Sequence, residues 1–99
     1  MKIFVCYTTR DAEITINLLK KISKKLSTYG VVFIDIIDNN STNKQLRVIS
    51  ELESSDLIVV IESKSIYQSE WVALEIKKAK LKKIPIKILQ VKELSNFTL

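Results

Sequence analysis

The residues of this sequence best suited to chemistry are Trp71 and Glu75, which lie four positions apart. On a helix, this spacing places an aromatic ring and a carboxylate on one face, one turn apart. The pair follows an apolar run with the composition of a buried strand, Leu57–Ile61, and then a serine-rich loop. Open α/β folds bind ligands at the carboxyl ends of such strands. We therefore predict a site here, with Glu75 as its reactive group.

A structural role for the same two residues remains an alternative. Glu75 could pair with Lys78 on an exposed helix face, which would contribute only a few tenths of a kcal/mol. Trp71 could be an ordinary core residue. Glu70 is a weaker candidate for the reactive acid, because it points about 100° away from the tryptophan and suits the first turn of a helix.

Further candidate substrate-binding residues follow the first and third expected strands, at the same edge of the sheet. They are Tyr7, Thr8, Thr9, Arg10, Ser63 and Ser65. Arg10 could bind the pyrophosphate of a dinucleotide through its two parallel donors, or it could pair with Asp11 or Asp35. The two serines could donate hydrogen bonds to a ribose or a phosphate, or could cap the turn.

Composition excludes several kinds of active site. The chain has no histidine, so Ser-His-Asp and Cys-His catalysis cannot occur. One cysteine, Cys6, and no histidine make a zinc site unexpected, and we predict that Cys6 is a small core residue. Asp35 and Asp38 stand among asparagines in ordinary loop composition, so no metal is expected. A single glycine rules out a Rossmann or Walker phosphate loop, and no permanently bound cofactor is expected.

Size and charge indicate one domain, 1–99, with a basic surface. The chain has 99 residues, 16 Lys and Arg against 11 Asp and Glu, and a net charge of +5. Many lysines fall on two predicted helices, which would attract an anionic ligand or simply form solvated faces. Nucleic acid is not expected as a partner, because the aromatic residues lie elsewhere. No apolar run is long enough for a membrane, no signal peptide is evident, and one cysteine fits a reducing cytoplasm.

Strands and helices are expected to alternate along the chain. The predicted strands are Lys2–Tyr7, Val31–Asp35, Leu57–Ile61 and Ile86–Leu89. The first predicted helix is capped by Thr9 or Asp11 and ends near Tyr29. The second runs from Lys44 to Ser54 and buries Leu46 and Leu52, together with either Val48 or Ile49. The third begins at Ser69 or Glu70 and has Val72, Ile76 and Ala79 at helical spacing. Gly30 directly follows the first predicted helix, and we expect it to adopt the left-handed conformation that often ends a helix.

This order predicts an α/β, flavodoxin-like three-layer fold with a parallel sheet of four or five strands in the order 2-1-3-4. The first helix should cover one face and the other two helices the opposite face. Only ten residues follow Leu89, too few for a strand and a full helix, so one face of Leu57–Ile61 is expected to be poorly covered. Either the tail folds back with Leu94, Phe97 and Leu99, or a second subunit covers that face, and we predict self-association.

Four segments resemble a small microbial Toll/interleukin-receptor (TIR) domain: KIFVCYTTRD, YGVVFID, SDLIVVIESKSIYQSEWVALEI and KKIPIKIL. The third segment is the most specific, and together the four extend through most of the chain up to Leu89. Two departures stand out. The loop after the second strand, IIDNNSTN, lacks the Pro-Gly of receptor adaptors, and the terminal strand-helix unit of longer TIR domains is expected to be truncated.

The resemblance implies an NAD+ glycohydrolase or cyclase that cleaves the nicotinamide-ribose bond, in bacterial defence or stress signalling. By motif position, Glu75 would be the catalytic residue and Trp71 its aromatic neighbour. NAD+ or a related nucleotide would then be a substrate, and a second copy or another TIR-like protein a partner. Two alternatives remain open: a non-enzymatic TIR-like interaction module, and a nucleoside deoxyribosyltransferase-like enzyme, which also uses a Glu at an N-glycosidic bond.

Overall fold

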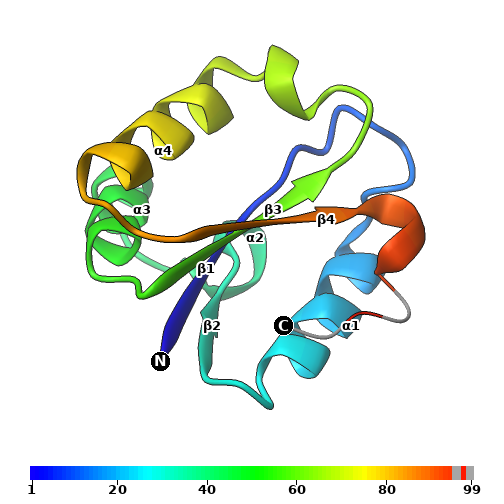
Figure 1. Ribbon diagram of the computed structural model, residues 1–99, viewed down its shortest axis with the longest axis horizontal. Helices are drawn as coiled ribbons and strands as arrows, with labels where there is room; N and C mark the ends of the chain where they lie inside the picture. Colours follow the sequence, from blue (N-terminus) through cyan, green and yellow to red (C-terminus); the bar gives the residue numbers. More distant parts are fainter. Residues whose placement is uncertain (95–96, 98–99) are drawn as a thin grey trace.

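A four-stranded parallel sheet forms the centre of the protein (Figure 1). The structure is a computed structural model, and it describes residues 1–94 and 97. Its strands are β1 (Lys2–Cys6), β2 (Val31–Phe33), β3 (Leu57–Glu62) and β4 (Ile86–Gln90). They pair in the order β2-β1-β3-β4, and every pairing is parallel. The predicted α/β class, strand number and strand order are confirmed.

Helices cover both faces of the sheet, as predicted (Figure 1). α1 (Ile16–Leu26) lies on one face, and α3 (Lys44–Glu53) and α4 (Glu70–Leu81) lie on the other. Three short elements complete the described chain: α2 (Asp35–Asp38) and the 3-10 helices η1 (Ile66–Gln68) and η2 (Val91–Glu93). Because all four strands run in one direction, the residues that follow β1, β2 and β3 meet at one edge of the sheet.

The start of the first helix was predicted wrongly. α1 begins at Ile16 with Thr15 as its cap, whose hydroxyl accepts from Leu18 N at 3.2 Å. Asp11 does not cap the helix, because its carboxylate accepts hydrogen bonds from the backbone and hydroxyl of Ser65 instead. The segment between Asp11 and the helix is a loop that buries Ile14.

Strand β2 is shorter than the predicted Val31–Asp35. The chain leaves the sheet after Phe33 and turns into α2, where the carboxylate of Asp38 accepts from Ile34 N at 2.7 Å. In α3, Val48 and Leu52 are buried and Leu46 is 63% exposed, so the predicted burial of Leu46 is wrong. Tertiary contacts determine both where β2 ends and which face of α3 is buried, and a short periodic pattern in the sequence does not contain this information.

Gly30 is required for a close approach of two chain segments, and not for a left-handed turn as predicted. No glycine has a positive φ, but a Cβ at Gly30 would lie 2.2 Å from Met1 O. That carbonyl accepts from Val31 N at 2.9 Å, which aligns the starts of β1 and β2. The left-handed residue among those described is Lys83, with φ 58°, directly after α4.

We expect opposite effects from two backbone substitutions. Gly30→Ala should lower the free energy of unfolding by about 1–3 kcal/mol, since the methyl group must displace the backbone of Met1, the residue before β1. Lys83→Gly should raise it by roughly 0.5–1 kcal/mol, because a lysine is strained at positive φ. Urea denaturation measures both changes. A tolerated alanine at Gly30 would show that the start of β1 moves aside without cost.

The core on the α1 side is closed by the C-terminal segment. Val59 and Ile61 of β3 are 0% exposed, so the prediction that this face is poorly covered is wrong. Leu94 and Phe97 pack into the same cluster as α1, and the ring of Phe97 also lies 4.9 Å from the ammonium of Lys25. These two residues support the fold-back alternative of the sequence analysis. Leu99, named with them, lies outside the described residues.

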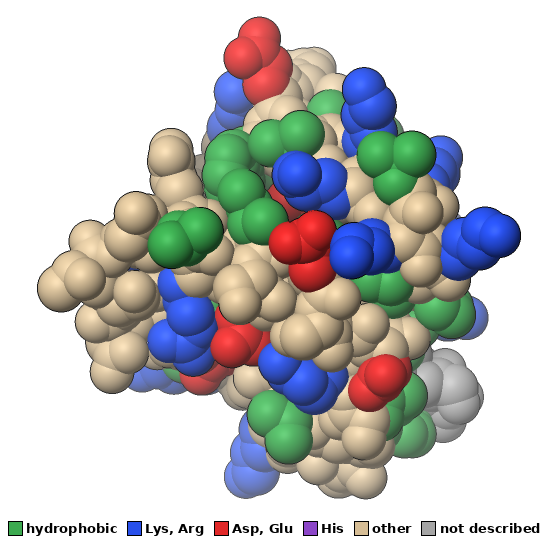
Figure 2. Space-filling model, turned by 90° about the vertical axis from the view of Figure 1, so that its left-hand side faces the viewer, with side chains coloured by type: hydrophobic (Ala, Val, Ile, Leu, Met, Phe, Trp, Pro, Cys, Tyr) green, Lys and Arg blue, Asp and Glu red, His purple; other side chains and the backbone are tan. Residues whose placement is uncertain are grey.

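On the face formed by α3 and α4, basic side chains are interspersed with other types rather than gathered in one patch (Figure 2). Figure 2 shows the side formed by α3 and α4, where Lys and Arg side chains alternate with apolar and acidic ones. This arrangement is typical of solvated helix faces. In the described part of the chain, no helix has the length and apolar character needed to span a bilayer.

Candidate active site

A cavity of about 170 Å³ opens at the carboxyl-terminal edge of the sheet. It lies where β1 ends, beside the start of α2 and the first turns of α4. The residues that line it are Val5, Tyr7, Thr8, Thr9, Asp35, Trp71 and Glu75. Five residues predicted for the site, Tyr7, Thr8, Thr9, Trp71 and Glu75, are thus brought together.

Helix α4 directs Glu75 inward. The hydroxyl of Ser69 caps the helix by accepting from Val72 N at 3.3 Å, which fixes where the helix starts. Val72, Glu75 and Ala79 then form its buried face, and Glu75 is only 7% exposed. An exposed pair between Glu75 and Lys78 is therefore not what the structure shows. Trp71 is half-buried and lines the cavity one turn before Glu75.

Burial raises the pKa of Glu75 from its ordinary 4.5 to about 7. Hydrogen bonding from the Cys6 thiol and the Trp71 side chain lowers it in part, and the negative charge of Asp35 raises it further. Near neutral pH, Glu75 therefore exchanges between the protonated and the charged form. A carboxyl group with that property can act as an acid or a base under physiological conditions.

Cys6 is fully buried in β1 against Glu75. Burial raises the pKa of its thiol well above 9.0, and the neighbouring carboxylate raises it further. At neutral pH the thiol therefore keeps its proton, and its S–H donates a hydrogen bond to the Glu75 carboxylate. The predicted role of Cys6 as a small core residue is confirmed by its burial, and its contact with Glu75 is an addition that the sequence did not indicate.

Tyr7 connects β1 to α2 across the cavity wall. Its hydroxyl oxygen accepts a hydrogen bond from Ile36 N at 3.0 Å. Burial is the main reason that its pKa rises to about 12, with smaller contributions from Asp35 and Glu75. Tyr7 is therefore protonated throughout the neutral range, and its O–H remains a donor beside the two acids.

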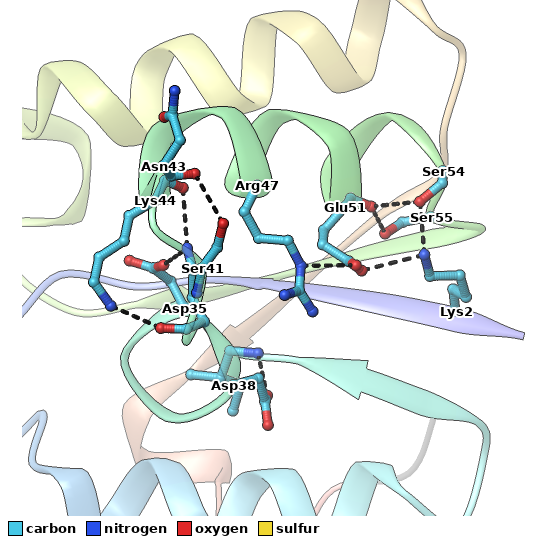
Figure 3. Close-up of polar contacts among 12 residues, drawn as sticks. Lys2, Asp35, Asp38, Ser41, Asn43, Lys44, Arg47, Glu51, Ser54 and Ser55 are labelled. Atoms are coloured by element: carbon cyan, nitrogen blue, oxygen red, sulfur yellow. Dashed lines mark hydrogen bonds and ion pairs between the residues drawn. The ribbon is translucent and has the colours of Figure 1, made fainter.

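Asp35 is the charged residue of the cavity lining that was not predicted for the site. One of its carboxylate oxygens accepts from Asn39 Nδ2 at 2.7 Å, and the same amide donates to Lys44 O at 3.0 Å. Lys44 Nζ in turn donates to Asn39 O at 2.7 Å (Figure 3). An acidic residue directly after the second strand was the available signal, and the prediction that the strand extends through it concealed this.

Figure 3 also shows a second polar network on the same side of the sheet, running along α3. Glu51 binds Lys2 Nζ at 3.2 Å and Arg47 Nε at 3.1 Å, and the Arg47 guanidinium lies 5.3 Å from the Phe33 ring. These contacts hold α3 against the start of β1 and the end of β2. They support the sheet and do not contribute side chains to the cavity.

Three predicted site residues do not line the cavity. Arg10 is exposed, and its Nη1 donates to Gln68 O at 3.1 Å. Ser65 binds the Asp11 carboxylate through both its N–H and its hydroxyl, each at 2.8 Å, and so joins the loops that follow β1 and β3. Ser63, the first residue after β3, is 5% exposed. Within the described residues, no three His, Cys, Asp or Glu side chains are grouped as a metal site requires.

Comparison with known proteins identifies the family. The chain aligns with the structure of a 2-deoxyribosyltransferase from the psychrotolerant bacterium Bacillus psychrosaccharolyticus with a TM-score of 0.65 and 15% identity. The alignment covers 91% of this chain and 72% of that one, and at this identity it shows a shared fold. Among curated proteins, none matches. Residues 4–96 match the family described as Thoeris protein ThsB, TIR-like domain, and the chain therefore belongs to that family, as the sequence resemblance predicted.

Proposed function

We propose that the protein cleaves the nicotinamide-ribose bond of NAD+, as a hydrolase or a cyclase, within Thoeris defence. The observation that carries this proposal is the buried Glu75 in a cavity that also presents the indole of Trp71. Membership of a family named for a Thoeris protein supports the defence context. The family assignment alone does not specify a reaction, so the argument depends on the chemistry of the cavity.

Breaking an N-glycosidic bond develops positive charge on the ribose. A carboxylate held beside that ribose stabilises the developing cation, and it does so strongly where water is largely excluded. The burial of Glu75 supports this role, since its side chain is only 7% exposed, and its pKa of about 7 leaves a large charged fraction at neutral pH. Attack by water would give hydrolysis, and attack by the adenine or ribose of the substrate itself would give a cyclic product.

The experiment is to incubate the purified protein with NAD+ at high protein concentration and to follow free nicotinamide. We expect release by the wild-type chain and none above background with Glu75→Gln, which removes the charge but keeps the size. Glu70→Gln is the matched control, because Glu70 is exposed and outside the cavity, and it should retain activity. Release that survives Glu75→Gln would refute the assignment of the site.

A second enzymatic candidate is transfer of a deoxyribosyl group between bases. The shared fold with a 2-deoxyribosyltransferase favours it, and such a reaction would also use Glu75 at an N-glycosidic bond. Incubation with a deoxynucleoside and a second free base separates the two candidates. Exchange of the base without nicotinamide release from NAD+ would favour the transferase.

We further propose that the protein self-associates or assembles with another TIR-like protein. The support is not an uncovered face of β3 but the exposed apolar side chains of Tyr67 and Leu81, which line one groove along α4. Light scattering over a range of protein concentrations tests this, and a constant monomer mass would contradict self-association. If neither NAD+ nor nucleosides are turned over even at high concentration, the protein would instead act as a non-enzymatic interaction module.

A further inference from the structure

The cavity has an unusual charge for a protein of this composition. Its lining contains two acids, Asp35 and Glu75, and no lysine or arginine, although the chain has 16 basic residues. Arg10 directly follows the lining residue Thr9, yet it is exposed and bound to Gln68 O. A phosphate placed in this cavity would meet two acids and no cation, which is unfavourable.

The other lining groups favour a flat cation. The indole of Trp71 has an electron-rich face, which attracts a positive charge more strongly when the site is shielded from water. The cavity volume of about 170 Å³ is also below the roughly 300–1,000 Å³ typical of sites for drug-sized ligands. A single ring with part of its sugar is therefore a better match for the cavity than a whole dinucleotide.

We infer that this cavity selects N-glycosides whose base is a cation, such as a pyridinium nucleoside. Asp35 sets this preference for a cationic base. Any phosphates of the substrate lie outside the cavity. The inference rests on the proposed function for the identity of the site, and it adds the substrate class. Asp35 suits the role because Asn39 holds one of its oxygens at 2.7 Å, so its carboxylate stays at the cavity wall.

The charge that a ligand meets here depends on every group facing Glu75. These groups are Cys6 at the end of β1, Tyr7 directly after β1, Asp35 in α2 and Trp71 in α4. Cys6 and Tyr7 are neutral at neutral pH, because burial raises both of their pKa values. Asp35 therefore adds a second acidic group to the cavity wall beside Glu75, and it is the one that a cationic ligand meets on the α2 side.

The test compares two small probes that differ mainly in charge: the 1-methylnicotinamide cation and neutral nicotinamide. Trp71 is the single tryptophan, so its indole N–H resonance in an NMR titration reports binding without any turnover. We expect the cation to bind about tenfold more tightly at pH 8. Inorganic pyrophosphate should not displace it.

Asp35→Asn should reduce that preference several-fold while the asparagine oxygen still accepts from Asn39, so the local structure is kept. Asp38→Asn is the matched control, since Asp38 lies on the same helix outside the cavity, and it should retain the preference. The spectra also show whether each variant is folded. Equal binding of the two probes, no saturable binding of the cation, an unchanged preference in folded Asp35→Asn, or displacement by pyrophosphate would overturn the inference.

This outcome is separable from that of the proposed function. Cation preference without cleavage of NAD+ would leave the inference standing and refute the activity. Cleavage of NAD+ without cation preference would do the reverse. Nicotinamide riboside then serves as the decisive substrate, because it carries the cationic base and no phosphate, and we expect it to be cleaved in an Asp35-dependent manner.

Discussion

Replacing Glu75 by glutamine is expected to raise the free energy of unfolding by about 2–3 kcal/mol at pH 8, and to abolish the proposed release of nicotinamide from NAD+. The pKa of Glu75 is raised from 4.5 to about 7, so the folded state holds this proton more tightly than the unfolded state does. Each pKa unit corresponds to about 1.4 kcal/mol. Ionising a buried carboxyl therefore destabilises the folded protein, and glutamine removes that cost.

The stability difference between Glu75→Gln and the wild type should increase as the pH rises from 4.5 to 7. Below pH 4.5 the carboxyl is protonated in both states, so the glutamine variant should gain almost nothing there. Between pH 4.5 and 7 the unfolded state loses the proton first, and the advantage of the variant should grow. Above about pH 7 both states are ionised, and the advantage should stay constant.

Urea denaturation of the wild type and Glu75→Gln at pH 4 and pH 8 checks this prediction. The relevant quantity is the difference between the two proteins, because other acids titrate equally in both. Glu70→Gln is again the control and should differ little from the wild type at either pH, because Glu70 is exposed. A stability gain that does not change with pH would show that the ionisation of Glu75 is not its cause.

Replacing Phe97 by alanine is expected to lower the free energy of unfolding by about 3 kcal/mol, near the lower end for a buried phenylalanine. Phe97 is 6% exposed and closes the core on the α1 side together with Leu94. Alanine would leave a void beside α1 and would remove the contact with the Lys25 ammonium. Such a loss is large against the 5–15 kcal/mol typical of a small domain.

Denaturation at several protein concentrations measures the effect of Phe97→Ala. Leu46→Ala is a suitable control, because Leu46 is 63% exposed and should contribute less than about 0.5 kcal/mol. The comparison also separates the two ways of covering β3. If a second subunit covered that face instead of the tail, Phe97→Ala would have a small effect and stability would depend on concentration.

The arrangement of strands could be predicted from the sequence because each strand is a short apolar run bounded by polar residues. Leu57–Ile61 is such a run, and it became β3 with one residue added at its end. Glu75 could be predicted because its helix is well marked by the Ser69 cap. In both cases the local pattern and the tertiary structure agree, which is the condition under which sequence patterns succeed.

The errors occurred where long-range contacts override the local pattern. The segment after Phe33 is apolar enough for a strand, yet the hydrogen bond from Ile36 N to the Tyr7 hydroxyl holds it in α2. That contact spans 29 positions and brings Asp35 to the cavity. Arg10 was expected in the site because it follows β1, but the backbone carbonyl of Gln68 holds its side chain elsewhere. No single-sequence pattern encodes such pairings.

The burial of Cys6 gives this protein a natural probe of its own opening. The thiol is 0% exposed, lies against Glu75 and is the single cysteine of the chain. A thiol reagent can reach it only when the elements packed against β1 on this face separate, and the raised pKa of the thiol makes the closed form unreactive as well. The rate of labelling of Cys6 therefore reports the frequency of the local opening that exposes the thiol. A ligand that binds in the cavity should stabilise the closed form and lower that rate, so binding can be measured on the wild-type sequence.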